Sequence, residues 1–122
     1  MAPDSNLTER LGLGADVRIL ILNCDDLGMY PAVNRGIVEA VTRGVATTCS
    51  LMTPCPGASQ AIELLRRHPE IPFGIHLTVV CDLPALRWGP LVSKEKVRSL
   101  LNDDGELFNV HRLDELMAAS AA

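Results

Sequence analysis

The chain has 122 residues, of which 48% are hydrophobic and 3% aromatic, and its formal net charge is −4. These values fit one globular domain, or part of one, and exclude a chain that is disordered throughout. The acidic balance, without any run of Lys or Arg, argues against nucleic acid and anionic membrane surfaces as partners.

Residues 1–16 are predicted to form a flexible N-terminal lead-in to one domain that covers 17–122. The lead-in lacks the apolar region of a secretory signal, and no apolar stretch approaches the roughly 20 residues that span a bilayer. We therefore expect a cytoplasmic protein with reduced thiols that behave as small buried hydrophobic groups. The four cysteines are Cys24, Cys49, Cys55 and Cys81.

Strands and helices are predicted to alternate over the first 80 residues. The expected elements, in order, are a strand at 17–23, a helix from Pro31 to about Gly44, a strand at 46–52, a helix at 58–67 and a strand at 73–80. The second helix is expected to turn Ala61, Ile62, Leu64 and Leu65 inward. This order predicts parallel strands with right-handed crossovers, and hence an α/β fold.

The alternation ends after residue 80. We expect a long loop at 83–92, a short helix at 94–101 capped by Ser93, a turn at 102–105 and a last helix at 113–119. Three strands are few for a parallel sheet, so open edges and apolar helix-facing surface are expected. A partner chain, with a second copy as one candidate, would have to cover them, which predicts a homo-oligomer.

Two adjacent acids, Asp25 and Asp26, follow the first predicted strand. Ligands bind at this edge of parallel α/β sheets. A turn followed by a helix N-terminus, which attracts acids through its dipole, is the structural alternative.

His76 is expected within the third strand of the same sheet. It could be a core histidine bonded to a carbonyl, or it could reach Asp26, because parallel strands bring their C-terminal ends together. Asp26 and His76 would then be half of a site for a divalent metal, which would offset the repulsion between the two acids. Hydroxyl groups at 47–53 lie between them in the predicted sheet, where a structural role is favoured over sugar binding.

Five short segments resemble the YdjC-like carbohydrate deacetylases, a family that includes chitooligosaccharide deacetylases. They lie, in order, at 23–28, 34–37, 48–52, 56–58 and 74–78. The resemblance implies a (β/α) barrel-like fold and a hydrolase that uses a divalent metal, Mg²⁺ or Zn²⁺, to remove N-acetyl groups from short sugars. It also implies that Asp25 is the catalytic base and that Asp26 and His76 are metal ligands; substrate-binding residues stay unknown.

The resemblance covers only the N-terminal part of the family pattern, which continues with a third ligand histidine and a general-acid histidine. His111 does not sit in a strand-like context and does not resemble the missing ligand. We therefore expect a fragment or truncated chain, and a non-catalytic carbohydrate-binding or interaction module is the alternative function. A phosphotransfer-type domain is a weaker alternative, because Lys94 and Lys96 do not lie at a strand edge.

Overall fold

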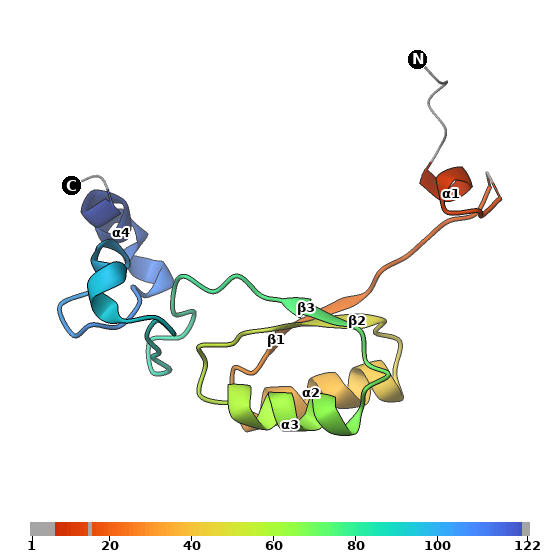
Figure 1. Cartoon of the computed structure of the whole chain (residues 1–122), viewed down its shortest axis with the longest axis horizontal. Coiled ribbons are helices and arrows are strands. Elements are labelled where there is room, and N and C mark those ends of the chain that lie inside the picture. The colour runs from red at the N-terminus through yellow and green to blue at the C-terminus, as the bar shows by residue number, and fades with distance from the viewer. Residues whose placement is uncertain (1–6, 15, 121–122) are drawn as a thin grey trace, which may run out of the picture.

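A three-stranded parallel sheet lies at the centre of the structure (Figure 1). The computed structural model describes residues 7–14 and 16–120. The strands are β1 (Asn23–Leu27), β2 (Thr48–Leu51) and β3 (Phe73–Ile75), in the spatial order β1-β2-β3. The predicted alternation and parallel pairing are therefore confirmed, and the fold is α/β.

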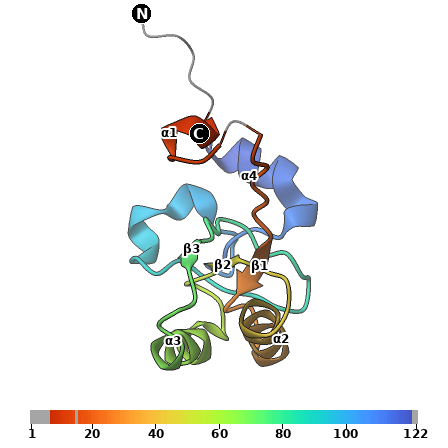
Figure 2. The same cartoon turned by 90° about the vertical axis from the view of Figure 1, so that its right-hand side faces the viewer.

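Helices α2 (Pro31–Thr42) and α3 (Ala58–Arg67) connect the strands and lie side by side on the same face of the sheet (Figure 2). Pro31 begins α2, where its missing N–H leaves no hydrogen bond unmade. Ala61 and Leu65 of α3 are buried as predicted, but Ile62 is 37% exposed, so its inward placement was wrong. The core between sheet and helices consists of Leu27, Ile37, Cys49, Leu51, Ala61, Leu65 and Ile71.

The first strand begins later than its apolar sequence predicts. Residues 17–22 form no strand, and Leu20 and Ile21 are 72% and 70% exposed. The reason is pairing: Asn23 stands opposite Thr48, the first residue of β2, and the chain before Thr48 turns away after α2. Leu22 still contacts the chain before β2, because its carbonyl accepts from the Thr47 N–H at 2.9 Å. Residues 18–21 make no backbone hydrogen bond to another segment among the described residues, so they form no strand.

Two later predictions also need correction. The third strand ends at Ile75, so His76 lies one residue beyond β3 instead of inside it. The helix predicted at 94–101 is two short 3₁₀-helices, at Lys94–Lys96 and Arg98–Leu100, and the Ser93 side chain makes no cap hydrogen bond. The last helix, α4 (Leu113–Ser120), and the turn at 102–105 form as predicted.

The segment after β3 builds a second hydrophobic cluster beyond one end of the sheet (Figure 1). Trp88 is 4% exposed, so it packs in this cluster and is not available to stack on a sugar. The backbone of Cys81 holds the segment together, because its N–H donates to Phe108 and its carbonyl accepts from Val110. The buried members are Met29, Met52, Cys55, Cys81, Trp88 and Leu107.

Near the N-terminus, α1 (Leu7–Arg10) is a single helical turn, and the rest of the predicted lead-in up to residue 6 lies outside the described residues. The boundary between lead-in and domain stays a prediction. Three of the four cysteines are buried and Cys24 is half-buried, and all four are free thiols. None of the described helices is long and apolar enough to cross a bilayer.

Asn34 joins the loop after β1 to the start of α3. Its side chain is fully buried; Oδ1 accepts from the Gly28 N–H at 2.6 Å, and Nδ2 donates to the Gly57 carbonyl at 2.9 Å. Gly28 has φ of 101°, and a Cβ there would lie 2.8 Å from the Met52 carbonyl oxygen, so only glycine fits this turn. Asn34 therefore sets the path of the chain directly after Asp25 and Asp26.

Asn34→Ala is expected to lower the free energy of unfolding by about 2–3 kcal/mol, because the buried Gly28 N–H loses its acceptor. Urea denaturation followed by circular dichroism measures the change. Thr42→Ala is the matched control on the exposed side of α2 and is expected to change stability by less than about 0.5 kcal/mol. Equal effects of the two substitutions would contradict a structural role for Asn34.

Candidate functional site

A bulge in β1 places both acids beside the neighbouring strand. Cys24 pairs with Cys49 and Leu27 with Leu51, so Asp25 and Asp26 together stand opposite the single residue Ser50. Asp26 has φ of 71°, a left-handed conformation that Asp tolerates better than most residues. The acids were predicted to follow the strand, and they lie within it instead. In a regular strand their side chains would point to opposite faces, and the bulge removes that separation.

His76 completes the meeting point from the third strand. Its backbone N–H donates to the Leu51 carbonyl at 2.9 Å, which continues the pairing of β3 with β2 by one residue. Its ring Nδ1 lies 3.4 Å from Oδ1 of Asp26, and the two side chains are 31% and 40% exposed. The predicted convergence of Asp26 and His76 is confirmed, and the roles of the three predicted site residues remain predictions.

Ser50 of β2 connects Asp25 of β1 with His76, which follows β3. Its hydroxyl donates to Asp25 Oδ1 at 2.7 Å and lies 3.3 Å from His76 Nδ1. Asp25 Oδ1 accepts a second hydrogen bond from the Asn23 amide at 2.6 Å. We call Asn23, Asp25, Asp26, Ser50 and His76 the rim cluster.

Sequence reasoning favoured a structural role for the hydroxyl groups of β2 and did not assign Asn23. The available signal was the alternation of Thr48 and Ser50 with the buried Cys49 and Leu51. Residues at i and i+2 share a face, so this pattern places Ser50 on the face away from α2 and α3. The bulge that brings Asp25 to the same face has no comparable signal.

Burial and neighbouring acids raise the pKa of Asp26 above its ordinary value of 3.8. Removal of water is the largest cause; Asp82 and Asp25 add to it by repulsion, and His76 opposes it. Asp82 was not assigned from the sequence, and it adds a third acid to the surroundings of the rim cluster. A cation placed among these carboxylates would relieve their repulsion.

Cys55, whose pKa is raised in part by these acids, is not a nucleophile at neutral pH. Burial, followed by repulsion from Asp82, Cys81 and Asp26, raises the pKa of Cys55 to about 12. Thiol chemistry requires the thiolate, which this environment disfavours. The titratable side chains of the rim cluster are two carboxylates and one imidazole.

Asp26 and His76 could hold a metal ion as an oxygen donor and a nitrogen donor. This donor pair suits zinc and several other divalent ions. The residues described here contain no group of three or more His, Cys, Asp or Glu side chains that could hold a metal. Two donors are fewer than a tight site uses, so the pair fits a cation in part and needs further ligands.

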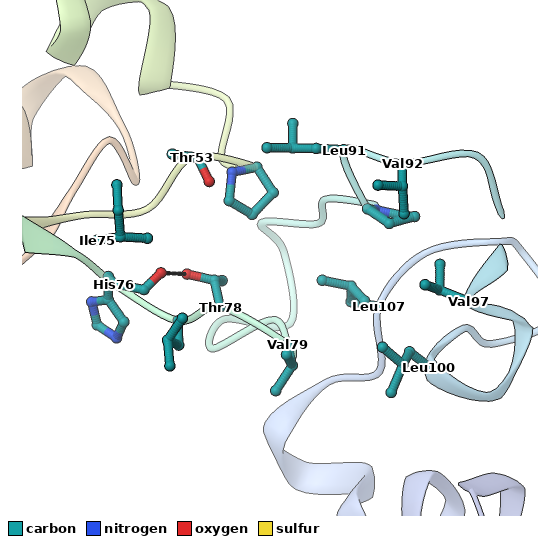
Figure 3. A pocket seen from close by; sticks show the side chains of 13 residues that line it. Thr53, Ile75, His76, Thr78, Val79, Leu91, Val92, Val97, Leu100 and Leu107 are labelled. Atoms are coloured by element: carbon teal, nitrogen blue, oxygen red, sulfur yellow. Dashed lines mark hydrogen bonds between the residues drawn. The ribbon is translucent and has the colours of Figure 1, made fainter.

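An apolar hollow of about 290 Å³ borders His76 (Figure 3). It lies between the chain that continues from β3 and the segment 90–107. Thr53 and Thr78 add hydroxyl groups to its lining, and the Thr78 hydroxyl donates to the His76 carbonyl at 2.9 Å. A molecule that reaches the rim cluster from this side would meet apolar walls and few polar groups.

The other two histidines lie outside the rim cluster. His68 ends α3 and contacts Glu70 at 3.1 Å. His111 lies in the 3₁₀-helix Val110–Arg112 directly before α4, and its backbone N–H donates to the Asn109 side chain. Neither one supplies the further ligand that Asp26 and His76 need.

A family model described as YdjC-like protein matches residues 19–122. Among curated relatives, the chain is 39% identical to a carbohydrate deacetylase of Geobacillus stearothermophilus over 73% of this chain and 33% of that protein. It is 32% identical to a chitooligosaccharide deacetylase of Serratia marcescens over 74% of this chain and 32% of that protein. The chain thus spans about a third of the length of these relatives.

A solved structure shares the same fold over most of the chain. It is a putative cellobiose-phosphate cleavage protein from Enterococcus faecalis, with a TM-score of 0.66 and 31% sequence identity. The match covers 81% of this chain and 39% of that one.

Asp26→Asn is expected to raise the free energy of unfolding at pH 7 in metal-free buffer. The raised pKa means that the charged carboxylate is less favourable in the folded protein than in the unfolded chain, and Asn tolerates the same backbone conformation. The gain should stay below about 1 kcal/mol, because the side chain is 40% exposed.

The same gain is expected to shrink as the pH falls from above the raised folded-state pKa towards 3.8, and to be lost below 3.8, where the carboxyl group is protonated in both states. Urea unfolding at several pH values measures it, with the exposed turn variant Asp103→Asn as control. A gain that is independent of pH would show that repulsion and burial of the charge are not its cause.

Proposed function

This chain belongs to the YdjC-like protein family, and we propose that its rim cluster is part of a metal-dependent hydrolase that removes N-acetyl groups from short acetylated sugars such as chitooligosaccharides. The observation that supports the proposal is that Ser50 joins Asp25 to His76 while Asp26 lies beside His76, all on one rim of a parallel sheet. The relatives named carbohydrate deacetylase and chitooligosaccharide deacetylase give the reaction and the substrate class.

In this proposal Asp26 and His76 hold a divalent cation, Mg²⁺ or Zn²⁺, together with further ligands. The bound cation would supply positive charge that polarises an amide carbonyl and acidifies water. The raised pKa of Asp26 is consistent with a carboxylate that gains from a nearby cation, because its charge is otherwise opposed by burial and by two other acids.

Asp25 is the proposed general base. Its Oδ1 already accepts hydrogen bonds from Asn23 and Ser50, and Oδ2 accepts none of the hydrogen bonds found among the described residues. Oδ2 can therefore take a proton from water as the water attacks the acetamide carbon, while the two donors hold the carboxylate in place. The departing amine then needs a proton from an acid outside the rim cluster.

The sheet offers support for the barrel-like architecture that this proposal includes. Helices cover the apolar face, whereas Thr48, Ser50 and His76 belong to the other face together with Asp25. In (β/α) barrels the helices form the outer ring and catalytic residues stand at the C-terminal ends of the strands. The positions of Asp25, Asp26 and His76 fit that arrangement.

Asp25→Asn is expected to lower acetate release from di-N-acetylchitobiose by about 10²–10⁴-fold, because an amide cannot take the proton from water. The assay measures free acetate with added Mg²⁺ or Zn²⁺ and with chelator. Asp114→Asn, an exposed acid of α4, is the matched control and should leave the rate unchanged. Acetate release that survives Asp25→Asn would contradict the assignment of the base.

A carbohydrate-binding or interaction module is the second candidate function. It is favoured by one observation, namely that the described residues provide only two of the side chains that a metal site needs. Calorimetric titration with di-N-acetylchitobiose separates the two functions. Binding without acetate release, with or without metal, would support the module and contradict the hydrolase.

We also propose that the chain forms a homo-oligomer and acts in the cytoplasm. Leu77 is 87% exposed and Val79 is 51% exposed along the chain that continues from β3, at a free edge of the sheet. Exposed apolar side chains beside an unpaired strand favour association.

Light scattering after size-exclusion chromatography is expected to give a mass above 13.2 kDa for the wild-type chain. Leu77→Glu should reduce that mass, because it places a charge in the apolar contact. Leu11→Glu should not reduce it, because exposed Leu11 directly follows α1, which lies away from the sheet in Figure 1. A monomeric wild-type chain at every concentration would contradict self-association.

A further inference from the structure

We propose that Ser50 is a positioning residue that holds the neutral His76 ring with its proton on Nδ1, so that Nε2 keeps its lone pair for a ligand. The inference rests on the proposed function only for what Nε2 binds. The hydrogen positions themselves follow from the contacts of the rim cluster.

The Ser50 hydroxyl has one proton and two polar neighbours. Asp25 Oδ1 is 2.7 Å from Ser50 Oγ, and a carboxylate can only accept, so the hydroxyl proton points to Asp25. The contact of 3.3 Å between Ser50 Oγ and His76 Nδ1 must then use a lone pair of the oxygen. The proton in that contact has to come from the imidazole, which places it on Nδ1.

The second neighbour of Nδ1 leads to the same assignment. Asp26 Oδ1 lies 3.4 Å from Nδ1 and is also an acceptor when ionised. An unprotonated Nδ1 would face two oxygen lone pairs without a proton between them. In a neutral imidazole the proton on Nδ1 leaves Nε2 as the acceptor or metal ligand.

In this arrangement the Ser50 hydroxyl accepts a hydrogen bond on one side and donates one on the other. His76 donates a hydrogen bond to Ser50, and Ser50 donates one to Asp25. One hydroxyl therefore orients both the proposed metal ligand and the proposed base. Partners of this kind fix the tautomer of ligand histidines in many metal sites. Alanine at this position would leave the strand intact but remove the bridge.

Nuclear magnetic resonance of the ¹⁵N-labelled, metal-free chain tests the proposal, because long-range ¹H–¹⁵N spectra distinguish a protonated from an unprotonated ring nitrogen. The chain has three histidines, and His76→Gln identifies the signals of His76 by their loss. Spectra are taken at a pH above which the His76 signals no longer move. The wild-type ring is expected mainly in the Nδ1–H form.

Ser50→Ala is expected to lower the ratio of Nδ1–H to Nε2–H forms by about fivefold, the effect of one hydrogen bond of ordinary net strength. Ser50→Thr keeps a hydroxyl and should restore the ratio. Thr48→Ala is the matched control, because Thr48 lies two residues earlier on β2 and its hydroxyl donates to Pro72. It should leave the ratio unchanged.

A wild-type ring mainly in the Nε2–H form would overturn the proposal, and so would a ratio that Ser50→Ala does not change. Neither result depends on acetate release. If the ratios behave as expected while the chain releases no acetate, Ser50 keeps its positioning role and the hydrolase proposal fails separately.

Discussion

The buried side chain of Asn34 is the constraint on which the rest of the structure depends. Its Oδ1 accepts a hydrogen bond from the Gly28 N–H, and its Nδ2 donates to the Gly57 carbonyl and the Gln60 side chain. One side-chain amide therefore fixes the end of β1 against the start of α3. Gly57 has no room for a Cβ, which would lie 2.8 Å from the Gly28 carbonyl oxygen. The loops after β1 and β2 thus meet at a defined distance, and β1 and β2 are held in register where the acids lie.

The rim cluster inherits its geometry from this arrangement. The bulge at Asp25 and Asp26 lies between the pair Cys24–Cys49 and the pair Leu27–Leu51, and both pairs include residues packed in the core beneath the sheet. The bulge therefore cannot move along the strand without taking buried side chains out of the core. Backbone conformations of this kind persist where the surrounding packing determines them, and functional sites are where they gather.

Much of the fold follows from local sequence signals, and the errors in the sheet share one cause. Pro31 and the spacing of apolar residues predict α2, and the ends of α3 are those expected at 58–67. The run at 17–22 is apolar enough for a buried strand, but a strand needs a neighbour, and pairing is decided by distant parts of the chain. The bulge also depends on the register between distant strands, so neither the bulge nor the face on which Asp25 lies could be predicted from local sequence. Asp26 and His76 could be brought together from sequence because parallel topology alone implies it, whereas Ser50 and Asp82 required the register and the path of the later chain.

The position of Trp88 has a practical consequence. It is the single tryptophan of the chain, and it is buried with Met29, Met52 and Cys81, apart from the core beneath the sheet. Its fluorescence therefore reports on the packing of the segment after β3, whereas far-ultraviolet dichroism is dominated by α2, α3 and α4. If the two signals change at different denaturant concentrations, the two clusters melt as separate cooperative units.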